Sequence, residues 1–371
     1  MKSIKTSCKL AALALAMIML TSCGGRETPT QEAAAPETAT EQTADTPETA
    51  SAAELEKHTR QVFAMDTVML LTAYGVEAEE ALEAAEAEIY ALEADLDPES
   101  VRGSVYALNA GAGGQVVISR EAYDVMSTAM QYYIASGGAL DPGLYPLSKA
   151  WGFIGGDYRV PAQSEINTLL SVKNTGGILL DEAACAASIP AGMEVSFGAV
   201  AKGYTAQRVV DLMADMGVSS AILSLGGNVQ TLGDAKPDGS AWQVAVQAPD
   251  GSSGYVGILS VGQAAVVTSG GYQRYFVQDG VTYIHILDPV TGYPVQNDLL
   301  SVTVVTDDGA KADALSTTLF VLGKDAALDF YAAQGDFELV LITRDDHVIV
   351  TPGLAEVFAE TGDGYTYEYL G

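Results

Sequence analysis

The chain has 371 residues, with 18 Lys and Arg against 48 Asp and Glu, so its formal net charge at pH 7 is −30. This charge excludes nucleic-acid binding through a basic, phosphate-neutralising surface, and it disfavours attraction to anionic lipid headgroups. Because hydrophobic residues make up 48% of the chain and charged residues 18%, most of it can bury a core, which excludes full-length disorder.

The first 22 residues have the pattern of an export signal. Lysines precede an apolar run over 10–20 that is too short for a stable membrane span, and small residues then lead to Cys23. This pattern predicts a lipoprotein signal peptide (1–22), with Cys23 as the lipidation site. The alternative is an ordinary secreted protein in which the cysteine occurs by chance. We expect an exported protein on the extracytoplasmic side of a bacterial cell membrane, held there by its lipid anchor only.

Residues 23–54 contain the lipidated Cys23 and then an acidic stretch without aromatic or branched aliphatic residues. Such a stretch cannot bury enough apolar area to offset its ordering entropy, so we expect a disordered linker. One folded domain is expected over 55–371. Cys185 is the single thiol of that domain, which predicts no intrachain disulfide.

Hydrophobic periodicity predicts interleaved helices and strands in this domain. Helices are expected at 76–96, 121–135, 162–172, 202–216, 310–322 and 325–333. Strands are expected at 63–74, 177–181, 193–197, 219–225, 242–248, 256–261, 264–268, 273–278, 281–287, 299–306, 337–343 and 347–351. The segment 138–153 is expected to be an extended loop. Asp-Gly pairs at 250–251 and 279–280 favour hairpins, so we expect an α+β fold with an antiparallel sheet and packed helices.

The segment 283–294 reads YIHILDPVTGYP and contains a candidate base. Strand alternation puts Tyr283, His285 and Leu287 on one face, next to an Asp-Pro turn that ends the strand. An imidazole fixed in this way suits proton transfer near neutral pH. The alternative is a core histidine beside a structural turn.

The segment 310–320 reads AKADALSTTLF and contains a candidate metal pair. On a helix, Asp313 and Thr317 lie on one face at positions i and i+4. A carboxylate and a hydroxyl are hard oxygen ligands, which suit Mg²⁺ when substrate phosphates complete its coordination. The alternative is an acidic residue that stabilises the first turn of a helix.

Three further segments are candidates for binding a phosphate or a flat ligand. The segment 196–204 is expected to end in a helix N-terminus with Lys202, which suits an anion. Residues 268–272, with Arg274, combine hydroxyls, backbone N–H groups and a cation. The aromatic loop 138–153 could cover a flat ligand. Each segment also has a purely structural alternative, but together with the metal pair and the base they provide what a pyrophosphate ligand needs.

In this order, the motifs resemble those of the ApbE family of flavin transferases over about residues 63–323. The resemblance rests on MDTV (65–68), GALDPGLYPLSKAWGF (138–153), SFGAVAKGYTAQRVVD (196–211), ILSLGGNVQTLG (222–233), TSGGYQRYF (268–276), HILDPVTGYPV (285–295), LLSVTVV (299–305) and ADALSTTLFVLG (312–323).

The resemblance implies a T-fold-like flavin-transferase domain that binds FAD with Mg²⁺. It also implies transfer of the FMN half to a Thr or Ser hydroxyl of an exported target, with release of AMP. Targets in the family are subunits of sodium-pumping NADH:quinone reductase, Rnf-type complexes and similar flavoproteins. By the same resemblance, His285 is the base, and the metal ligands are Asp313, Thr317, the Ala199 carbonyl and Ser316. The residues expected to contact FAD are Met65, Ala139, Leu140, Asp141, Ser196, Lys202 and Leu287.

The chain departs from the family pattern at several positions. Ser196 stands where many members have Asp, Asp66 where Gly is common, and Gly143 where Thr is common. The alternative functions are an FAD pyrophosphatase that uses water as the nucleophile, a non-catalytic flavin-binding lipoprotein, and an acidic lipoprotein that acts only through surface interactions.

Overall fold

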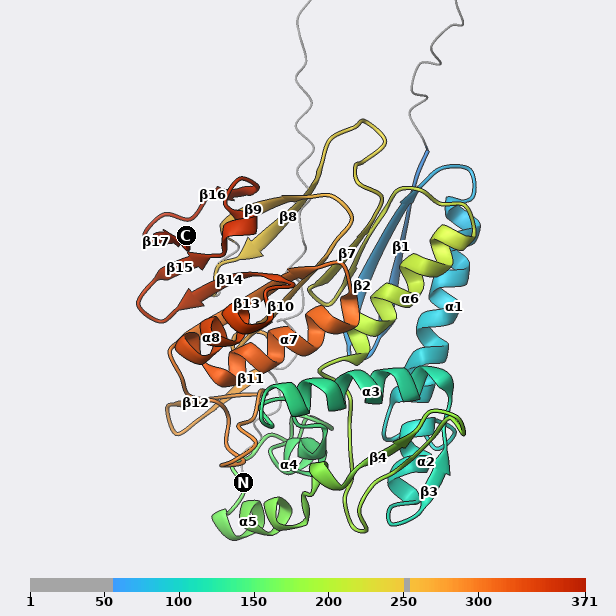
Figure 1. The fold of residues 1–371 in the computed structure, drawn as a ribbon, viewed down its shortest axis with the longest axis vertical. Helices are drawn as coiled ribbons and strands as arrows, with labels where there is room; N and C mark the ends of the chain where they lie inside the picture. Colours follow the sequence, from blue (N-terminus) through green and yellow to red (C-terminus); the bar gives the residue numbers. More distant parts are fainter. Residues whose placement is uncertain (1–55, 250–253) are drawn as a thin grey trace, which may run out of the picture. The chain divides into compact units, whose positions relative to one another are not determined.

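A nine-stranded sheet is the largest element of the computed structural model, which describes residues 56–249 and 254–371 (Figure 1). In spatial order its strands are β1 (Lys57–Ala64), β2 (Thr67–Tyr74), β6 (Ala221–Leu225), β7 (Asn228–Leu232), β10 (Ala265–Gly270), β13 (Leu299–Thr306), β14 (Glu338–Thr343), β15 (His347–Val350) and β17 (Thr366–Tyr369). Neighbouring strands are antiparallel up to β15, which pairs with β17 in parallel. The α+β class expected from the sequence is confirmed.

Side-chain alternation gives this sheet two apolar faces. In β14, Leu339 and Leu341 belong to the core beneath the helices, whereas Val340 and Ile342 belong to the core on the opposite face. This strand is therefore apolar at consecutive positions because both of its faces are covered.

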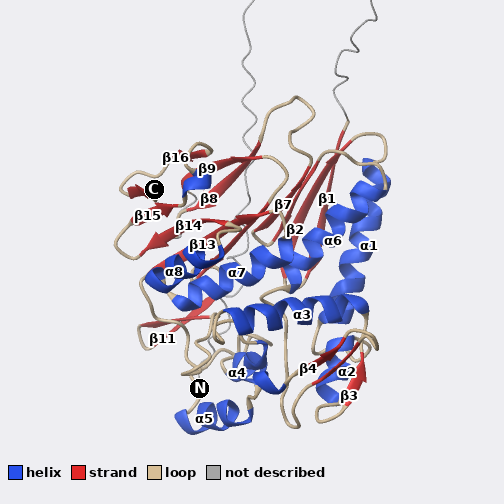
Figure 2. Cartoon of the chain, in the orientation of Figure 1, coloured by secondary structure: helices blue, strands red, loops and turns tan. Residues whose placement is uncertain are grey.

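Helices cover one face of the sheet (Figure 2). They are α1 (Ala78–Leu96), α6 (Ala201–Asp215), α7 (Gly309–Leu322) and α8 (Lys324–Gln334). Two glycines allow α6 and α7 to touch. A Cβ on Gly203 would lie 2.0 Å from the carbonyl oxygen of Gly309, and one on Gly309 would lie 2.4 Å from that of Gly203. This close approach brings the first turn of α6 against α7.

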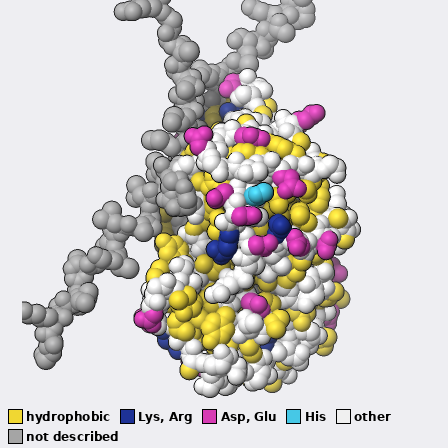
Figure 3. Space-filling model, turned by 90° about the vertical axis from the view of Figure 1, so that its left-hand side faces the viewer, with side chains coloured by type: hydrophobic (Ala, Val, Ile, Leu, Met, Phe, Trp, Pro, Cys, Tyr) yellow, Lys and Arg dark blue, Asp and Glu magenta, His cyan; other side chains and the backbone are white. Residues whose placement is uncertain are grey.

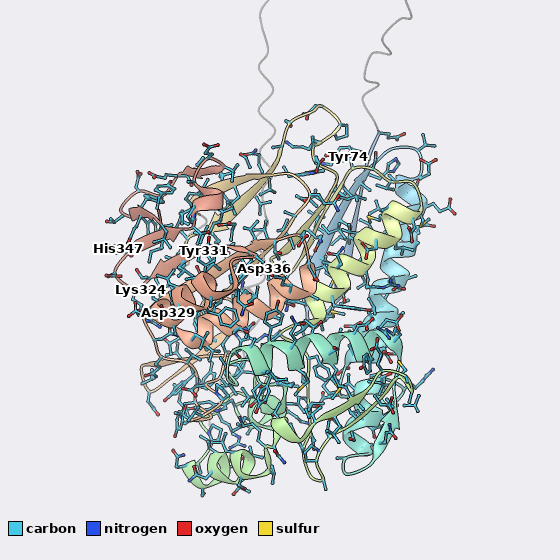
Figure 4. The ribbon with its side chains drawn as sticks, viewed as in Figure 1. Tyr74, Lys324, Asp329, Tyr331, Asp336 and His347 are labelled. Atoms are coloured by element: carbon cyan, nitrogen blue, oxygen red, sulfur yellow. The ribbon has the colours of Figure 1, made fainter. Side chains whose placement is uncertain are left out.

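A smaller antiparallel sheet covers part of the other face. Its strands, in spatial order, are β16 (Phe358–Glu360), β9 (Tyr255–Val261) and β8 (Trp242–Gln247). Trp242 packs against Tyr74, with ring centroids 6.3 Å apart. Tyr74 is the last residue of β2 and is labelled in Figure 4. The large sheet is therefore enclosed between helices and a second sheet.

The remaining elements lie below the large sheet in Figure 1. They are α2 (Ser104–Ala110), α3 (Arg120–Ala135), α4 (Tyr145–Ala150), α5 (Gln163–Val172), β3 (Gln115–Val117), β4 (Leu179–Asp181), β5 (Ala186–Ser188) and the hairpin of β11 (Tyr275–Gln278) and β12 (Val281–Ile284). Buried residues of α2, α3 and β5 share one core with α7, whereas those of α4 and α5 form a separate cluster. The candidate site lies where these elements meet the large sheet.

Three local predictions were wrong. The run 63–74 is not one strand but contains the turn between β1 and β2, at Met65 and Asp66. The segment 193–197 is irregular, because Val195 pairs with the side chain of Asn109 and Ser196 with the Pro142 carbonyl instead of a strand. The expected loop 138–153 contains the short helix α4. Pro146 lies in the first turn of this helix, where proline is favoured.

No helix in 56–249 or 254–371 is long and apolar enough to cross a membrane. The expected signal peptide (1–22), Cys23 and the whole of the expected linker up to residue 54 lie outside the described residues.

Candidate functional site

His285 follows directly after strand β12 and faces a backbone carbonyl. The carbonyl oxygen of Arg274 accepts a hydrogen bond from the His285 backbone N–H at 3.0 Å, and it lies 3.1 Å from ring atom Nδ1. Because a carbonyl oxygen can only accept, Nδ1 carries the proton and Nε2 of the neutral ring is left with a free lone pair. The ring also contacts Phe153 edge-on, with centroids 6.5 Å apart. This arrangement gives the imidazole the tautomer and orientation of a general base.

Its surroundings keep His285 neutral. Burial is the main cause that lowers the pKa of His285 to about 4, and the positive charges of Arg274 and Lys202 lower it further. The hydrogen bond to the Arg274 carbonyl acts in the opposite direction. At neutral pH the side chain is therefore in the form that can accept a proton.

This pKa predicts a loss of stability in acid. In the unfolded chain His285 would be protonated below about pH 6.5, whereas the folded protein keeps it neutral down to about pH 4. Between these values the unfolded state binds more protons, so the free energy of unfolding falls as the pH falls, by roughly 3 kcal/mol in total. Urea titrations at pH 7 and pH 4.5 measure the free energy of unfolding. Its decrease between the two pH values should be smaller for His285→Gln than for wild type. An equal loss in both proteins would contradict the prediction.

The turn after His285 is held by its own polar groups and by an aromatic cluster. Oδ1 of Asp288 accepts from the backbone N–H groups of Val290 and Thr291 at 2.7 and 3.1 Å. Nε1 of Trp151 donates to the carbonyl of Gly292 at 2.9 Å. The cluster consists of Trp151, Phe153, Tyr158, Phe276, Tyr283 and Tyr293. The aromatic cluster thus holds in place both the strand before His285 and the turn after it.

The candidate metal pair lies where α7 meets the start of α6. Oδ2 of Asp313 accepts from the Gly203 backbone N–H at 2.9 Å, and it lies 3.9 Å from Nζ of Lys202. The Ser269 hydroxyl lies 2.9 Å from that of Ser316 and 3.2 Å from that of Thr317. A carboxylate, a cation and hydroxyl groups from three elements therefore gather here.

These donors fit Mg²⁺. The contacts of Asp313 use Oδ2 only, so its other oxygen can serve a cation. Gly203 donates to Asp313 instead of to Ala199, so the carbonyl of Ala199, just before α6, is outside the helix ladder. Within the described ranges no three His, Cys, Asp or Glu side chains gather into a metal site. One carboxylate with neutral oxygens suits Mg²⁺ that also binds substrate phosphates, rather than a closed protein cage.

Asp141 is part of a buried ion pair. Its Oδ2 lies 2.5 Å from Nζ of Lys173, and its Oδ1 accepts from the Thr175 hydroxyl at 2.5 Å and from the Gly143 N–H at 2.9 Å. Lys173 also donates to the carbonyl of Pro289 at 3.0 Å. The network joins the loop after α3 to the turn after His285, and the carboxylate of Asp141 is itself fully engaged.

A small cavity brings several predicted residues together. It measures about 40 Å³, and it is lined by Ala129, Leu140, Asp141, Pro142, Ser196, Phe197, Ala199 and Val200. Ala139 adjoins it, with its backbone N–H bound to the Ser136 hydroxyl at 3.0 Å. The predicted FAD contacts at Leu140, Asp141 and Ser196 are thus neighbours of the predicted metal ligand Ala199.

Met65 and Leu287 lie at the borders of this region. Met65 occupies the turn between β1 and β2, and its Sδ lies 3.9 Å from the hydroxyl of Thr205 on α6. Leu287 is buried in the aromatic cluster and forms an isolated bridge with Pro294. Its side chain therefore supports the turn after His285.

Sequence reasoning did not single out Lys173 and Glu93, which hold parts of this site. Lys173 pairs with Asp141, 32 positions away, and Oε1 of Glu93 accepts from the Met65 N–H at 2.5 Å, across 28 positions. No local pattern could have identified either contact, because both depend on the tertiary fold.

The surface outside the site is mixed in charge. Figure 3 shows acidic side chains spread over one face among apolar and neutral ones, without a continuous basic band on that face. His347, at the start of β15, lies at the outer edge of the molecule together with Lys324 and Asp329 of α8 (Figure 4). It is therefore a suitable control for substitutions of His285.

Comparison with known proteins identifies the family of the chain. The ApbE family model matches residues 65–341, a range that contains every candidate residue from Met65 to Thr317. The FAD:protein FMN transferase of Klebsiella pneumoniae (strain 342) is 34% identical over 263 residues, covering 70% of this chain and 80% of the relative. That of Treponema pallidum (strain Nichols) is 32% identical over 265 residues, covering 67% and 73%. The crystal structure of the ApbE protein from Thermotoga maritima MSB8 superimposes with a TM-score of 0.72 at 28% identity, covering 78% of this chain and 94% of that one. The chain therefore belongs to the ApbE family.

Proposed function

We propose that this protein is a Mg²⁺-dependent FAD:protein FMN transferase that attaches FMN through a phosphoester to a Thr or Ser hydroxyl of an exported protein. The observation that carries the proposal is the neutral His285, with Nε2 free to accept a proton, together with the oxygen donors around Asp313. Lys202 links the two, because it lies 3.9 Å from Asp313 and its charge lowers the pKa of His285. Curated relatives that share this region are named for the same reaction.

In the transfer one O–P bond forms, one O–P bond breaks, and one group must accept a proton. The acceptor hydroxyl oxygen attacks the phosphorus of the FMN half, and its proton passes to Nε2 of His285. The phosphoanhydride bond breaks, and AMP leaves with the bonding electrons. His285 then returns the proton to solvent, so the cycle needs no oxidant or reductant.

The other residues act by positioning and by charge. Phosphoryl transfer depends mainly on alignment and charge neutralisation. Lys202, at the start of α6, adds a positive charge next to backbone N–H groups, which favours a phosphate there. Asp313, Thr317, Ser316 and the Ala199 carbonyl would hold Mg²⁺, and the Ser316 hydroxyl also lies 2.9 Å from that of Ser269. When bound, Mg²⁺ neutralises charge on the pyrophosphate and favours the departure of AMP.

The sequence pattern at the N-terminus supports the location that we propose. Lipidation at Cys23 would hold the enzyme on the extracytoplasmic side of the membrane, with 23–54 as a tether. The acceptors we propose are extracytoplasmic flavoproteins, such as subunits of sodium-pumping NADH:quinone reductase or Rnf-type complexes. Labelling with a radioactive fatty acid tests the anchor, because replacement of Cys23 by Ala should remove the label.

An assay of nucleotide products separates the transferase from its alternatives. Purified protein is incubated with FAD and Mg²⁺, with and without an acceptor domain, and AMP and free FMN are quantified by chromatography. AMP formed in proportion to acceptor, without free FMN, is the expected result. Equal AMP and FMN regardless of acceptor would indicate an FAD pyrophosphatase, and unchanged FAD a flavin-binding protein.

A further inference from the structure

Arg274 lies directly opposite His285 in the extended ladder of β11 and β12. Tyr275 pairs with Ile284, and the backbone N–H of His285 donates to the carbonyl of Arg274 at 3.0 Å. Directly opposite residues of an antiparallel pair point to the same face, with Cβ atoms about 5 Å apart. A guanidinium group is therefore placed beside the proposed base.

The guanidinium of Arg274 is loosely paired. Its NH1 donates to the carbonyl of Phe153 at 3.2 Å, and its NH2 lies 3.8 Å from Oδ2 of Asp66, whose side chain is 80% exposed. Three other arginines of the described chain hold carboxylates more closely, at 2.6 Å for Arg60, 2.9 Å for Arg120 and 2.5 Å for Arg159. Arg274 therefore keeps the capacity to bind a second anion.

When the base gains a proton, its positive charge repels the nearby guanidinium of Arg274. An anion bound between the two groups would offset this repulsion. In the proposed reaction the base gains a proton while negative charge spreads over the transferred phosphate. A guanidinium at this position would compensate that charge through directed hydrogen bonds.

We propose that Arg274 binds the phosphate on the FMN side of FAD, beside the oxygen that His285 deprotonates, and that Asp66 weakens this binding by competing for the guanidinium. The proposal rests on the proposed function of the site.

The turn that carries Asp66 is held in place by specific contacts. Met65 and Asp66 form a two-residue hairpin turn with φ values of 51° and 59°, a region that favours Gly, Asn and Asp. The side chain of Glu93 accepts a hydrogen bond from the Met65 N–H. On the other side, Gly226 packs closely against Thr67, since a Cβ on Gly226 would lie 2.4 Å from the Thr67 hydroxyl oxygen. Asp66 is thus presented to Arg274 by a well-defined backbone.

Three single variants test the proposal. Arg274→Gln removes the cation and keeps the backbone carbonyl that orients His285. Asp66→Asn removes the competing charge, and Asn tolerates the same backbone conformation. Arg120→Gln is the matched control, because Arg120 pairs with Asp124 at the start of α3. Dissociation constants of FMN and of AMP are measured by titration calorimetry with Mg²⁺ present, and folding is checked by thermal unfolding.

Arg274→Gln should weaken FMN binding about tenfold or more, the usual effect of a lost charge-assisted hydrogen bond, and should leave AMP binding within about twofold. Asp66→Asn should strengthen FMN binding about two- to fivefold at low salt, because exposed ion pairs are weak. The control should bind both nucleotides like wild type. The rate of transfer should fall with Arg274→Gln and rise at low FAD with Asp66→Asn.

Unchanged FMN binding in Arg274→Gln, equal weakening of FMN and AMP, or absence of FMN binding by wild type would each overturn the proposal. Weaker FMN binding by Asp66→Asn would overturn the competition. If wild type releases AMP and FMN but never modifies an acceptor, the proposed function fails while the FMN-specific effect of Arg274 stands.

Discussion

Replacement of His285 by alanine is expected to lower the rate of FMN transfer about 10²- to 10⁴-fold, the usual contribution of general base catalysis. The Arg274 carbonyl fixes the proton on Nδ1, so Nε2 is the atom that accepts the hydroxyl proton. Loss of the ring removes the proton acceptor but none of the oxygen donors around Asp313. Affinity for FAD, measured by quenching of flavin fluorescence, should therefore change little.

The control for this substitution is His347→Ala, because His347 lies at the start of β15, away from the elements that carry the site. It should transfer FMN at the wild-type rate. If His285→Ala transfers FMN like wild type, His285 is not the base. If it loses FAD binding to the same extent as its rate, its role is in binding rather than in proton transfer.

Replacement of Asp313 by asparagine has the second largest expected effect. The amide oxygen can still accept from the Gly203 N–H, so the contact between α6 and α7 is retained. The negative charge is lost, and the Mg²⁺ concentration that gives half-maximal transfer should rise at least about tenfold. A titration of initial rate against Mg²⁺ measures this shift.

Asp325→Asn is a matched control, since Asp325 lies on α8 with a side chain that is 90% exposed. Its Mg²⁺ dependence should equal that of wild type. If Asp313→Asn has the same Mg²⁺ dependence as wild type, Asp313 is not a metal ligand. If the variant is also less stable, Asp313 acts only as a hydrogen-bond acceptor for the first turn of α6.

The sequence predicted those features that a local pattern determines. The α+β class and the helix with Asp313 and Thr317 on one face follow from periodicity. The strand expected at 281–287 ends at Ile284, so His285 follows it instead of lying within it. The hairpin at Met65 and Asp66 was missed because such turns usually contain Gly or Asn, whose absence made 63–74 read as a single strand.

Long-range contacts account for most of what the sequence could not predict. Asp313 reaches Gly203 across 110 positions, and the two helices touch there only because glycines occupy both surfaces. Asp141 stood out as a candidate ligand residue, but its pairing with the partly buried Lys173 depends on how the loop after α3 folds. Tertiary packing decides these contacts, so a single sequence does not reveal them.

The central claim, that this protein attaches FMN to another protein, is tested most directly by the intact mass of an acceptor. An extracytoplasmic domain with an Asp-Gly-x-Thr-Gly-Ala-type segment is incubated with the protein, FAD and Mg²⁺, and is then analysed by mass spectrometry. The account predicts a mass gain of one FMN minus water, lost when the acceptor Thr is replaced by Val or when EDTA is present. An acceptor of unchanged mass, with FAD converted to FMN and AMP, would contradict it.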